Sequence, residues 1–173
     1  LMLSIRNLLK PSHGGPVATP GKDISWGAYY LSHVKGEASE EGVKAFSSRE
    51  EAEYAFLMGK IALQDWIRVP VKGELVITTT GRLILNSYFP ERIGFINETM
   101  GKKQLASVVK DSLEFYGQEF TARLLDNLKE LGFKYAERSG YSWGMSELPL
   151  IEKKQEIIDE GNKRVYEVEQ FYE

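Results

Sequence analysis

Apolar residues recur at helical spacing through the second half of the chain. Beyond Asn97 they follow one another at intervals of three and four positions, which is typical of helices with one buried face. The two apolar stripes consist of Leu105, Val108, Val109, Leu113 and Tyr116, and of Phe120, Leu124, Leu128 and Leu131. Gly117 separates the stripes and Gly132 follows the second. The pattern therefore predicts two amphipathic helices, broken at Gly117, the second ending at Gly132.

The first half of the chain carries the signals of one short helix. Ser48 and Glu51 form a Ser-x-x-Glu capping box, which satisfies backbone groups at the start of a helix. Gly59 stands where a C-cap glycine belongs, so we expect a helix between Ser48 and Gly59. Before it, the aromatic-rich stretch from Ile24 to Leu31 is expected to be buried.

An alternating pattern follows this helix. Apolar residues take every second position before and after Lys72-Gly73, a pair that favours a tight turn. They are Ile67, Val69 and Val71 before the turn, and Leu75 and Ile77 after it. The pattern predicts a β-hairpin between about Ile61 and Thr80. With the helices, it predicts an α+β fold that is mainly helical and has a small hairpin or sheet.

The last segment is predicted to form one long helix from Pro149 to Glu173, because proline is favoured at the first helical position. One apolar residue recurs there every seven positions, at Ile151, Ile158, Val165 and Tyr172. Such a repeat is typical of a coiled-coil seam that packs on a partner helix. Lys154 and Gly161 occupy intermediate positions where a coiled coil would carry apolar residues, so the seam is weak.

Composition and charge favour a globular protein in a reducing compartment. Of 173 residues, 42% are hydrophobic and none is cysteine, which excludes a disulfide scaffold or a cysteine-ligated zinc site and suggests the cytoplasm. The net charge is −3, and the stretch 147–173 alone carries −4. This is not the basic footprint of a free-standing nucleic-acid binder. No apolar run approaches the roughly 20 residues that cross a bilayer, so no membrane contact is expected.

The sequence lacks the motifs of a catalytic or metal centre. His13 and His33 are the only histidines, and neither has a second ligand at helical or hairpin spacing. The aspartates are scattered singly, whereas two-metal phosphoryl transfer needs clustered carboxylates. A Gly-x-Ser-x-Gly nucleophile elbow is also missing. We therefore predict no catalytic residue, bound metal or cofactor in this segment.

Four stretches agree in order and spacing with one known family. They are Asn7–Pro11 with Gly14, Pro16, Pro20, Asp23 and Gly27–Leu31; Thr79–Arg82 with Asn86 and Pro90; Asn97 with Lys102, Lys103 and Leu105; and Leu131–Ala136 with Arg138–Gly140 and Ser142. Together they span nearly the whole chain. By these stretches the chain resembles the β′ subunit family, the largest subunits of bacterial-type DNA-directed RNA polymerases.

The resemblance implies a division into three parts. Residues 1–23 would be the trailing edge of the active-site domain, and residues 24–140 the pore domain beside the secondary channel. Residues 141–173 would open the funnel with the first helix of an antiparallel rim coiled coil. The family's Asp-x-Asp-x-Asp motif, which holds Mg²⁺, would precede Leu1. The chain is thus expected to be part of a nucleotidyltransferase, and to be inactive alone.

The resemblance also implies partners and a role. The partners would be the β, α and ω subunits, template DNA and RNA in the complete enzyme, nucleoside triphosphates, and regulators that dock at the secondary channel. Mg²⁺ would belong to the complete polymerase. The role would be to shape the channel by which nucleotides enter.

Five cations are candidates for lining this channel, namely Lys22, Arg82, Lys102, Lys103 and Arg138. Cationic walls raise the local concentration of anions such as nucleotides. Arg82 and Arg138, each near a glycine of a matched stretch, are the preferred pair.

The glycines and tryptophans of these stretches are interpreted structurally. Gly81 and Gly132 each allow a positive φ or a close backbone approach, and we interpret them as a turn and a helix C-cap. Trp26, Trp66 and Trp143 are interpreted as packing residues, because no basic stripe accompanies them.

Two alternatives remain open from the residues alone. One is a free-standing protein-interaction module whose acidic C-terminal helix pairs with a partner helix. The other is a small hydrolase, for which the sequence offers no nucleophile or metal set. An upstream sequence close to Asn-Ala-Asp-Phe-Asp-Gly-Asp would favour the polymerase over the interaction module.

Overall fold

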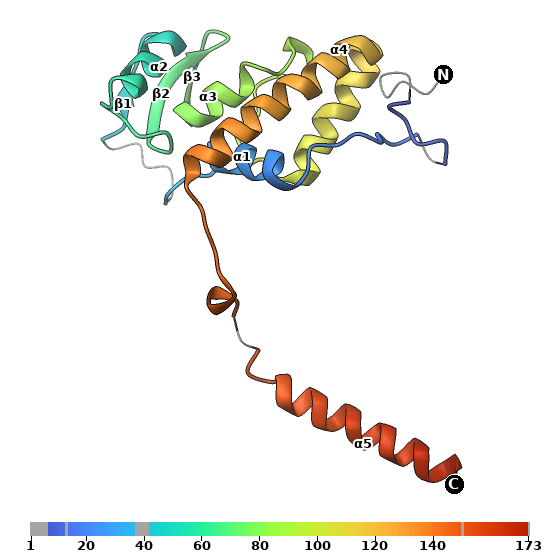
Figure 1. Cartoon of the computed structure of the whole chain (residues 1–173). Helices are drawn as coiled ribbons and strands as arrows, with labels where there is room; N and C mark the ends of the chain where they lie inside the picture. Colours follow the sequence, from blue (N-terminus) through green and yellow to red (C-terminus); the bar gives the residue numbers. More distant parts are fainter. Residues whose placement is uncertain (1–6, 13, 37–41, 150, 173) are drawn as a thin grey trace. The chain divides into compact units, whose positions relative to one another are not determined.

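The computed structural model describes residues 7–12, 14–36, 42–149 and 151–172, so His13 lies outside the described residues. The chain divides into two compact units, Leu1–Gly140 and Tyr141–Glu173, and each is described by itself (Figure 1). The predicted α+β class is confirmed, since helices dominate and one small sheet is present. Among the described residues, no helix is both long and apolar enough to cross a membrane.

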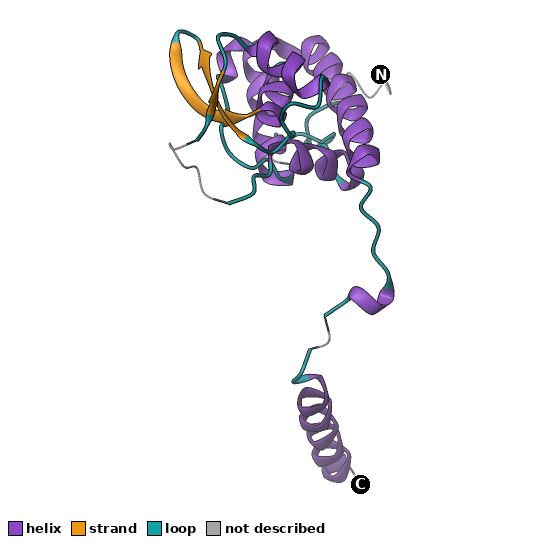
Figure 2. Cartoon of the chain, turned by 90° about the vertical axis from the view of Figure 1, so that its left-hand side faces the viewer, coloured by secondary structure: helices purple, strands orange, loops and turns teal. Residues whose placement is uncertain are grey.

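The first unit sets a three-stranded sheet at one side of its helices (Figure 2). In chain order it contains α1 (Lys22–Ser32), β1 (Lys44–Ala45), α2 (Arg49–Leu57), β2 (Trp66–Val71), β3 (Glu74–Thr79), α3 (Thr80–Asn86), the 3₁₀ turn η2 (Glu91–Ile93) and α4 (Lys102–Ser139). The sheet order is β1-β2-β3, with β1 parallel to β2 and β2 antiparallel to β3. Three of these elements, α1, β1 and α3, were not predicted.

The predicted hairpin is confirmed as β2 and β3. Lys72 and Gly73 form a two-residue turn with φ values of 53° and 91°, the positive values that a type I′ turn requires. This turn pairs Val71 with Glu74. Val76 and Thr78 of β3 therefore lie on the same face of the sheet as the buried residues of β2. Leu75 therefore lies on the opposite face and is 70% exposed. The apolar alternation after the turn does not continue the buried face.

The capping signals of α2 are confirmed, except that the Glu51 carboxylate binds Ser47 and not the N-cap residue Ser48. The Ser48 hydroxyl accepts from the Glu51 amide at 3.2 Å, while the Glu51 carboxylate accepts from the amide and hydroxyl of Ser47, both at 2.6 Å. At the other end Gly59 has φ 68° and donates to the carbonyl of Phe56, and the next amide donates to Ala55. This is a Schellman ending, the arrangement that a C-cap glycine favours.

The break in α4 is also confirmed. Gly117 has φ 77° and ψ −176°, so it separates two helical segments. Across the break, the Ser112 and Thr121 hydroxyl oxygens lie 3.0 Å apart, and Thr121 donates to the Gly117 carbonyl at 2.8 Å. The second segment continues past Gly132 to Gly140, whose φ of 61° ends it. The prediction of a helix C-cap at Gly132 is therefore wrong.

The core of the first unit has two clusters. The larger joins α1, α3 and α4 and consists of Ala28, Leu31, Leu63, Leu85, Phe89, Met100, Leu105, Val108, Leu124, Leu128, Leu131 and Tyr135. The smaller lies between α2, the sheet and α3 and consists of Ala52, Ile61, Ile67, Val69 and Leu83. Five residues of the two predicted stripes belong to the main core, and Phe120 packs against it; the five are Leu105, Val108, Leu124, Leu128 and Leu131.

The second unit contains a 3₁₀ turn, η3 (Met145–Glu147), and the helix α5 (Lys154–Tyr172). The helix starts at Lys154 and not at the predicted Pro149. Leu148, which precedes the proline, is extended, as proline favours for its preceding residue, and the Glu147 carboxylate already accepts from the Gly144 amide at 2.8 Å.

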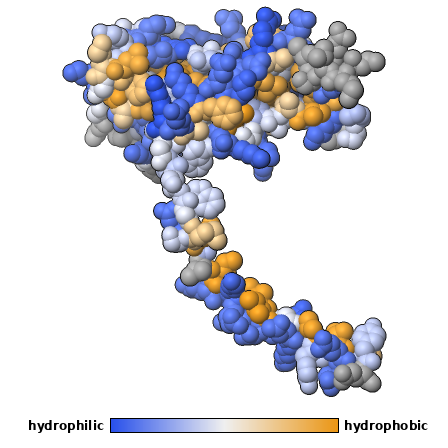
Figure 3. Space-filling view, viewed as in Figure 1, coloured by the Kyte–Doolittle hydropathy of each residue, from blue (hydrophilic) through white to orange (hydrophobic). Residues whose placement is uncertain are grey.

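The predicted seam of α5 is exposed. Figure 3 shows apolar side chains along this helix, and none of its described residues is buried. Ile151 precedes the helix and is 69% exposed. The seam residues on the helix, Ile158, Val165 and Tyr172, are 41, 56 and 87% exposed. Trp143 is 73% exposed as well, so the described residues give it no packing role. Pairing of α5 in a coiled coil stays a prediction.

Candidate functional site

The helices α1 and α4 cross at two glycines with almost no space between their backbones. A Cβ placed on Gly27 would lie 1.9 Å from the carbonyl oxygen of Gly132, and one on Gly132 would lie 2.7 Å from the Cα of Ile24. In the same way, a Cβ on Gly81 would lie 2.0 Å from the carbonyl oxygen of Leu31. Gly81 and Gly132 are thus sites of close backbone approach, which corrects their interpretation as a turn and a cap.

Exposed aromatic rings follow one side of α1. Trp26 and Tyr29 stack with centroids 5.7 Å apart, and Tyr29 stacks on His33 at 5.1 Å. Trp26 is 38% exposed, and its indole nitrogen donates to the Ser139 hydroxyl at the end of α4, at 3.2 Å. The indole therefore ties the surface of α1 to the residue that follows Arg138.

Arg138 is exposed in the last turn of α4, where the helix dipole favours a cation. Its guanidinium carbon lies 5.6 Å from the ring centroid of Tyr135. Burial raises the pKa of the Tyr135 hydroxyl, and the nearby Arg138 charge opposes part of that rise. Lys22 is also exposed, as the first residue of α1, one helical turn before Trp26. Both cations can meet an anion in solvent.

Lys102 and Lys103 lie at the other end of α4, in its first turn, and both are exposed. Lys103 lines a cavity of about 370 Å³ together with Glu98 and Asp111. The carboxylates offset its charge there. Nothing among the described contacts joins these two lysines to Arg138.

Arg82 lies in the interior of the first unit and is 5% exposed. Its Nε donates to the Ser32 carbonyl at 3.0 Å, and one Nη donates to the backbone carbonyl and side-chain oxygen of Asn97 at 2.8 and 3.0 Å. Its guanidinium carbon lies 5.4 Å from the ring centroid of Trp66. Burial lowers the pKa of Arg82, and the charge of Glu98 opposes this. These contacts are those of a structural residue, and a channel role for Arg82 stays a prediction.

Two asparagines complete the network around Arg82. Asn97 accepts from the Thr78 hydroxyl at 2.8 Å and donates to the Ile77 carbonyl at 2.9 Å. Asn86 donates to the Arg82 carbonyl and exchanges hydrogen bonds with the backbone of Ile96. Sequence reasoning gave these asparagines no role, although both stand in the matched stretches.

The described part of the chain offers no metal centre. Among residues 7–12, 14–36, 42–149 and 151–172, no three His, Asp or Glu side chains come together as ligands. The residues present therefore do not fit the Mg²⁺ that the resemblance implies for a complete polymerase, and no chemical step through Mg²⁺ is assigned to them.

Comparison with known proteins identifies the family. Residues 7–148 match the family model described as RNA polymerase Rpb1, domain 3. The chain is similar to proteins named DNA-directed RNA polymerase subunit beta′ from Sulfurihydrogenibium sp. (40% identical over 94% of this chain), Bdellovibrio bacteriovorus (38% over 100%) and Desulforudis audaxviator (40% over 99%). It spans only 10, 13 and 15% of the lengths of these relatives. The chain therefore belongs to the Rpb1 domain 3 family, which is part of the β′ subunits of DNA-directed RNA polymerases.

Proposed function

We propose that this chain forms the part of an RNA polymerase β′ subunit that borders the secondary channel, where nucleoside triphosphates enter. The observation that carries the proposal is the exposed position of Arg138 in the last turn of α4, next in sequence to Ser139, whose hydroxyl accepts a hydrogen bond from the Trp26 indole. The glycine contact between α1 and α4 leaves little room for the two helices to shift. The backbone of Arg138 is held in place by this packing, and its exposed side chain carries the positive charge into solvent.

The role of the channel wall is electrostatic. Arg138 and Lys22 attract the phosphates of an entering nucleotide and raise its local concentration, without contact with the reacting atoms. Lys102 and Lys103 lie at the other end of α4, where Glu98 and Asp111 offset the charge of Lys103, so they contribute less to this attraction. Catalysis belongs to Mg²⁺ and its carboxylate ligands elsewhere in the complete polymerase, where positioning and metal electrostatics account for most of phosphoryl transfer.

The proposed partners are those of the complete enzyme. They are the β, α and ω subunits, template DNA, RNA and nucleoside triphosphates, in the cytoplasm. The exposed seam of α5 supports a facing helix as a further neighbour, in the rim where regulators of the secondary channel dock. Covering an apolar side chain of this seam contributes about 1.5–3 kcal/mol.

The kinetic test uses a reconstituted polymerase whose β′ subunit contains this sequence. Arg138→Ala should raise the apparent KM for nucleotides by roughly two- to tenfold at low salt and leave the saturated rate unchanged, because slower arrival does not alter the transition state. The increase should shrink as added salt screens the charge. Lys129→Ala is the matched control, because Lys129 lies two and a half turns away, on the opposite face of α4. An unchanged KM at low salt would show that Arg138 does not line the nucleotide channel.

A further inference from the structure

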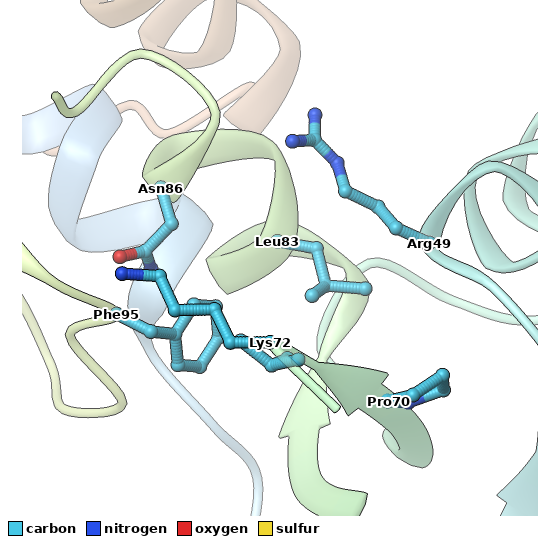
Figure 4. Close-up of a pocket in the computed structure, with 7 residues that line it drawn as sticks. Arg49, Pro70, Lys72, Leu83, Asn86 and Phe95 are labelled. Carbon is cyan, nitrogen blue, oxygen red and sulfur yellow. The ribbon is translucent and has the colours of Figure 1, made fainter. Parts of the chain in front are cut away.

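A cavity of about 210 Å³ opens between the β-hairpin, α3 and the start of α2. Figure 4 shows its lining residues as sticks. They are Arg49, Pro70, Val71, Lys72, Leu83, Asn86 and Phe95. Of the lining residues, only Asn86 stands in a stretch matched to the polymerase family. The two cations, Arg49 and Lys72, come from α2 and from the hairpin turn.

The interior of the cavity is apolar. Leu83 is 2% exposed and belongs to the smaller core cluster, against which Val71 and Phe95 also pack. The volume lies below the roughly 300–1,000 Å³ of typical small-molecule sites. One large apolar side chain suits the space better than a cofactor does.

Two cations border this interior, and no carboxylate lines it. Arg49 uses its Nε for Glu53 at 2.6 Å, which leaves both Nη groups without a hydrogen bond to any described residue. The Lys72 ammonium donates to the Glu91 carbonyl at 3.2 Å, an uncharged acceptor that does not neutralise it. The Asn86 amide is already committed to Arg82 and Ile96. Glu53 therefore balances the charge of Arg49, and the uncompensated positive charge at the rim comes from Lys72, while the Nη groups of Arg49 can still donate to a carboxylate.

We propose that this cavity docks a segment of a partner polypeptide in which one large apolar side chain lies next to acidic residues. The apolar side chain would fill the space above Leu83, as anchor residues of interfaces fill pockets. The flanking carboxylates would meet Arg49 and Lys72, which fixes the register of the segment. This docking is independent of the nucleotide-channel role.

The test uses the 173-residue chain, labelled with ¹⁵N, and a ten-residue peptide with blocked ends. The peptide carries Glu-Phe-Glu within a Gly/Ser background. Its two controls carry Glu-Ala-Glu and Gln-Phe-Gln. The expected result is a saturable amide shift at Val71, Leu83 and Phe95 with the first peptide, and clearly weaker binding of both controls. Absence of saturable shifts up to about 5 mM peptide would overturn the proposal.

Charge variants test the rim without touching the core. Arg49→Gln and Lys72→Gln should each weaken binding of the Glu-Phe-Glu peptide by up to about fivefold at low salt. Arg68→Gln is the matched control, because Arg68 pairs with Ile77 on the other face of the hairpin, and it should bind the peptide as the unchanged chain does. Thermal melts monitor folding of each variant.

Three further results would contradict the proposal. Equal binding of Glu-Ala-Glu would show a simple anion site, and equal binding of Gln-Phe-Gln would show an apolar site without charge recognition. Equal loss of binding in Arg68→Gln would show a general effect of charge.

Discussion

Gly27 of α1 and Gly132 of α4 lie more than a hundred positions apart in sequence, yet a Cβ on Gly27 would lie 1.9 Å from the carbonyl oxygen of Gly132. The contact involves backbone, which cannot move aside as a flexible side chain can. It lets α1 pack its buried face, with Ala28 and Leu31, onto the α4 residues of the main core. The position of Arg138 and Trp26 depends on the same crossing.

Gly27→Ala should therefore destabilise the first unit by roughly 1–3 kcal/mol or more, because the methyl group must push the helices apart. Urea denaturation measures the change. Gly21→Ala is the control, since a Cβ there meets only the Thr19 carbonyl oxygen at 3.9 Å. If both variants lose the same stability, the close crossing does not determine the packing of α1.

Arg82→Met should cost roughly 2–4 kcal/mol, because it keeps much of the apolar volume but leaves the buried oxygens of Ser32 and Asn97 without their donor. Arg138→Met should cost no more than about 1 kcal/mol, the size of its cation–π contact with Tyr135. The two variants are compared by denaturant unfolding. Equal losses would mean that the buried network around Arg82 is not structural.

Glu51 should give the first unit a stability that depends on pH. Hydrogen bonds from the hydroxyl and then the amide of Ser47 hold the pKa of the Glu51 carboxyl below its usual value. A lowered folded pKa stabilises the fold above the unfolded value of about 4.3, and this contribution is lost as the pH falls through the folded pKa. The chain should thus exceed Glu51→Gln in stability near neutral pH, and the difference should shrink below about pH 4. A difference that stays constant into acid would contradict this assignment.

The elements predicted from sequence are those that local chemistry determines. The Ser48 cap, the Gly59 ending, the Lys72-Gly73 turn and the break at Gly117 each depend on a few adjacent residues. The family was likewise predicted from short stretches that occur in the same order and with the same spacing as in the β′ subunits.

The features that could not be predicted depend on distant partners. The α4 sequence alone cannot show that Gly132 meets Gly27, or that the guanidinium of Arg82 finds its acceptors on Ser32 and Asn97. The alternation likewise could not show which face of β3 is buried, since only the pairing set by the turn decides which residues face the core. The site prediction therefore named the exposed Arg138 and the buried Arg82 with equal weight.

The exposed seam of α5 should support self-association once its intermediate positions become apolar. Positions 154, 161 and 168 form the second row of the repeat, and Val168 is already apolar. Lys154→Leu with Gly161→Leu fills the other two positions and should give concentration-dependent dimers in sedimentation equilibrium. The control adds the same two leucines at Glu156 and Lys163, away from the seam. Equal association of both variants would show nonspecific hydrophobic association and would contradict the coiled-coil interpretation.

The most direct test of the channel assignment is site-specific photo-crosslinking in an active, reconstituted polymerase whose β′ subunit contains this sequence. A photoreactive residue is placed at position 138 in one enzyme and at position 129, on the opposite face of α4, in another. With a radiolabelled nucleoside triphosphate, we expect crosslinks from position 138 that an excess of unlabelled nucleotide removes, and none from position 129. Crosslinks from position 129 alone, or equal crosslinking from both positions, would contradict the placement of Arg138 on the nucleotide channel.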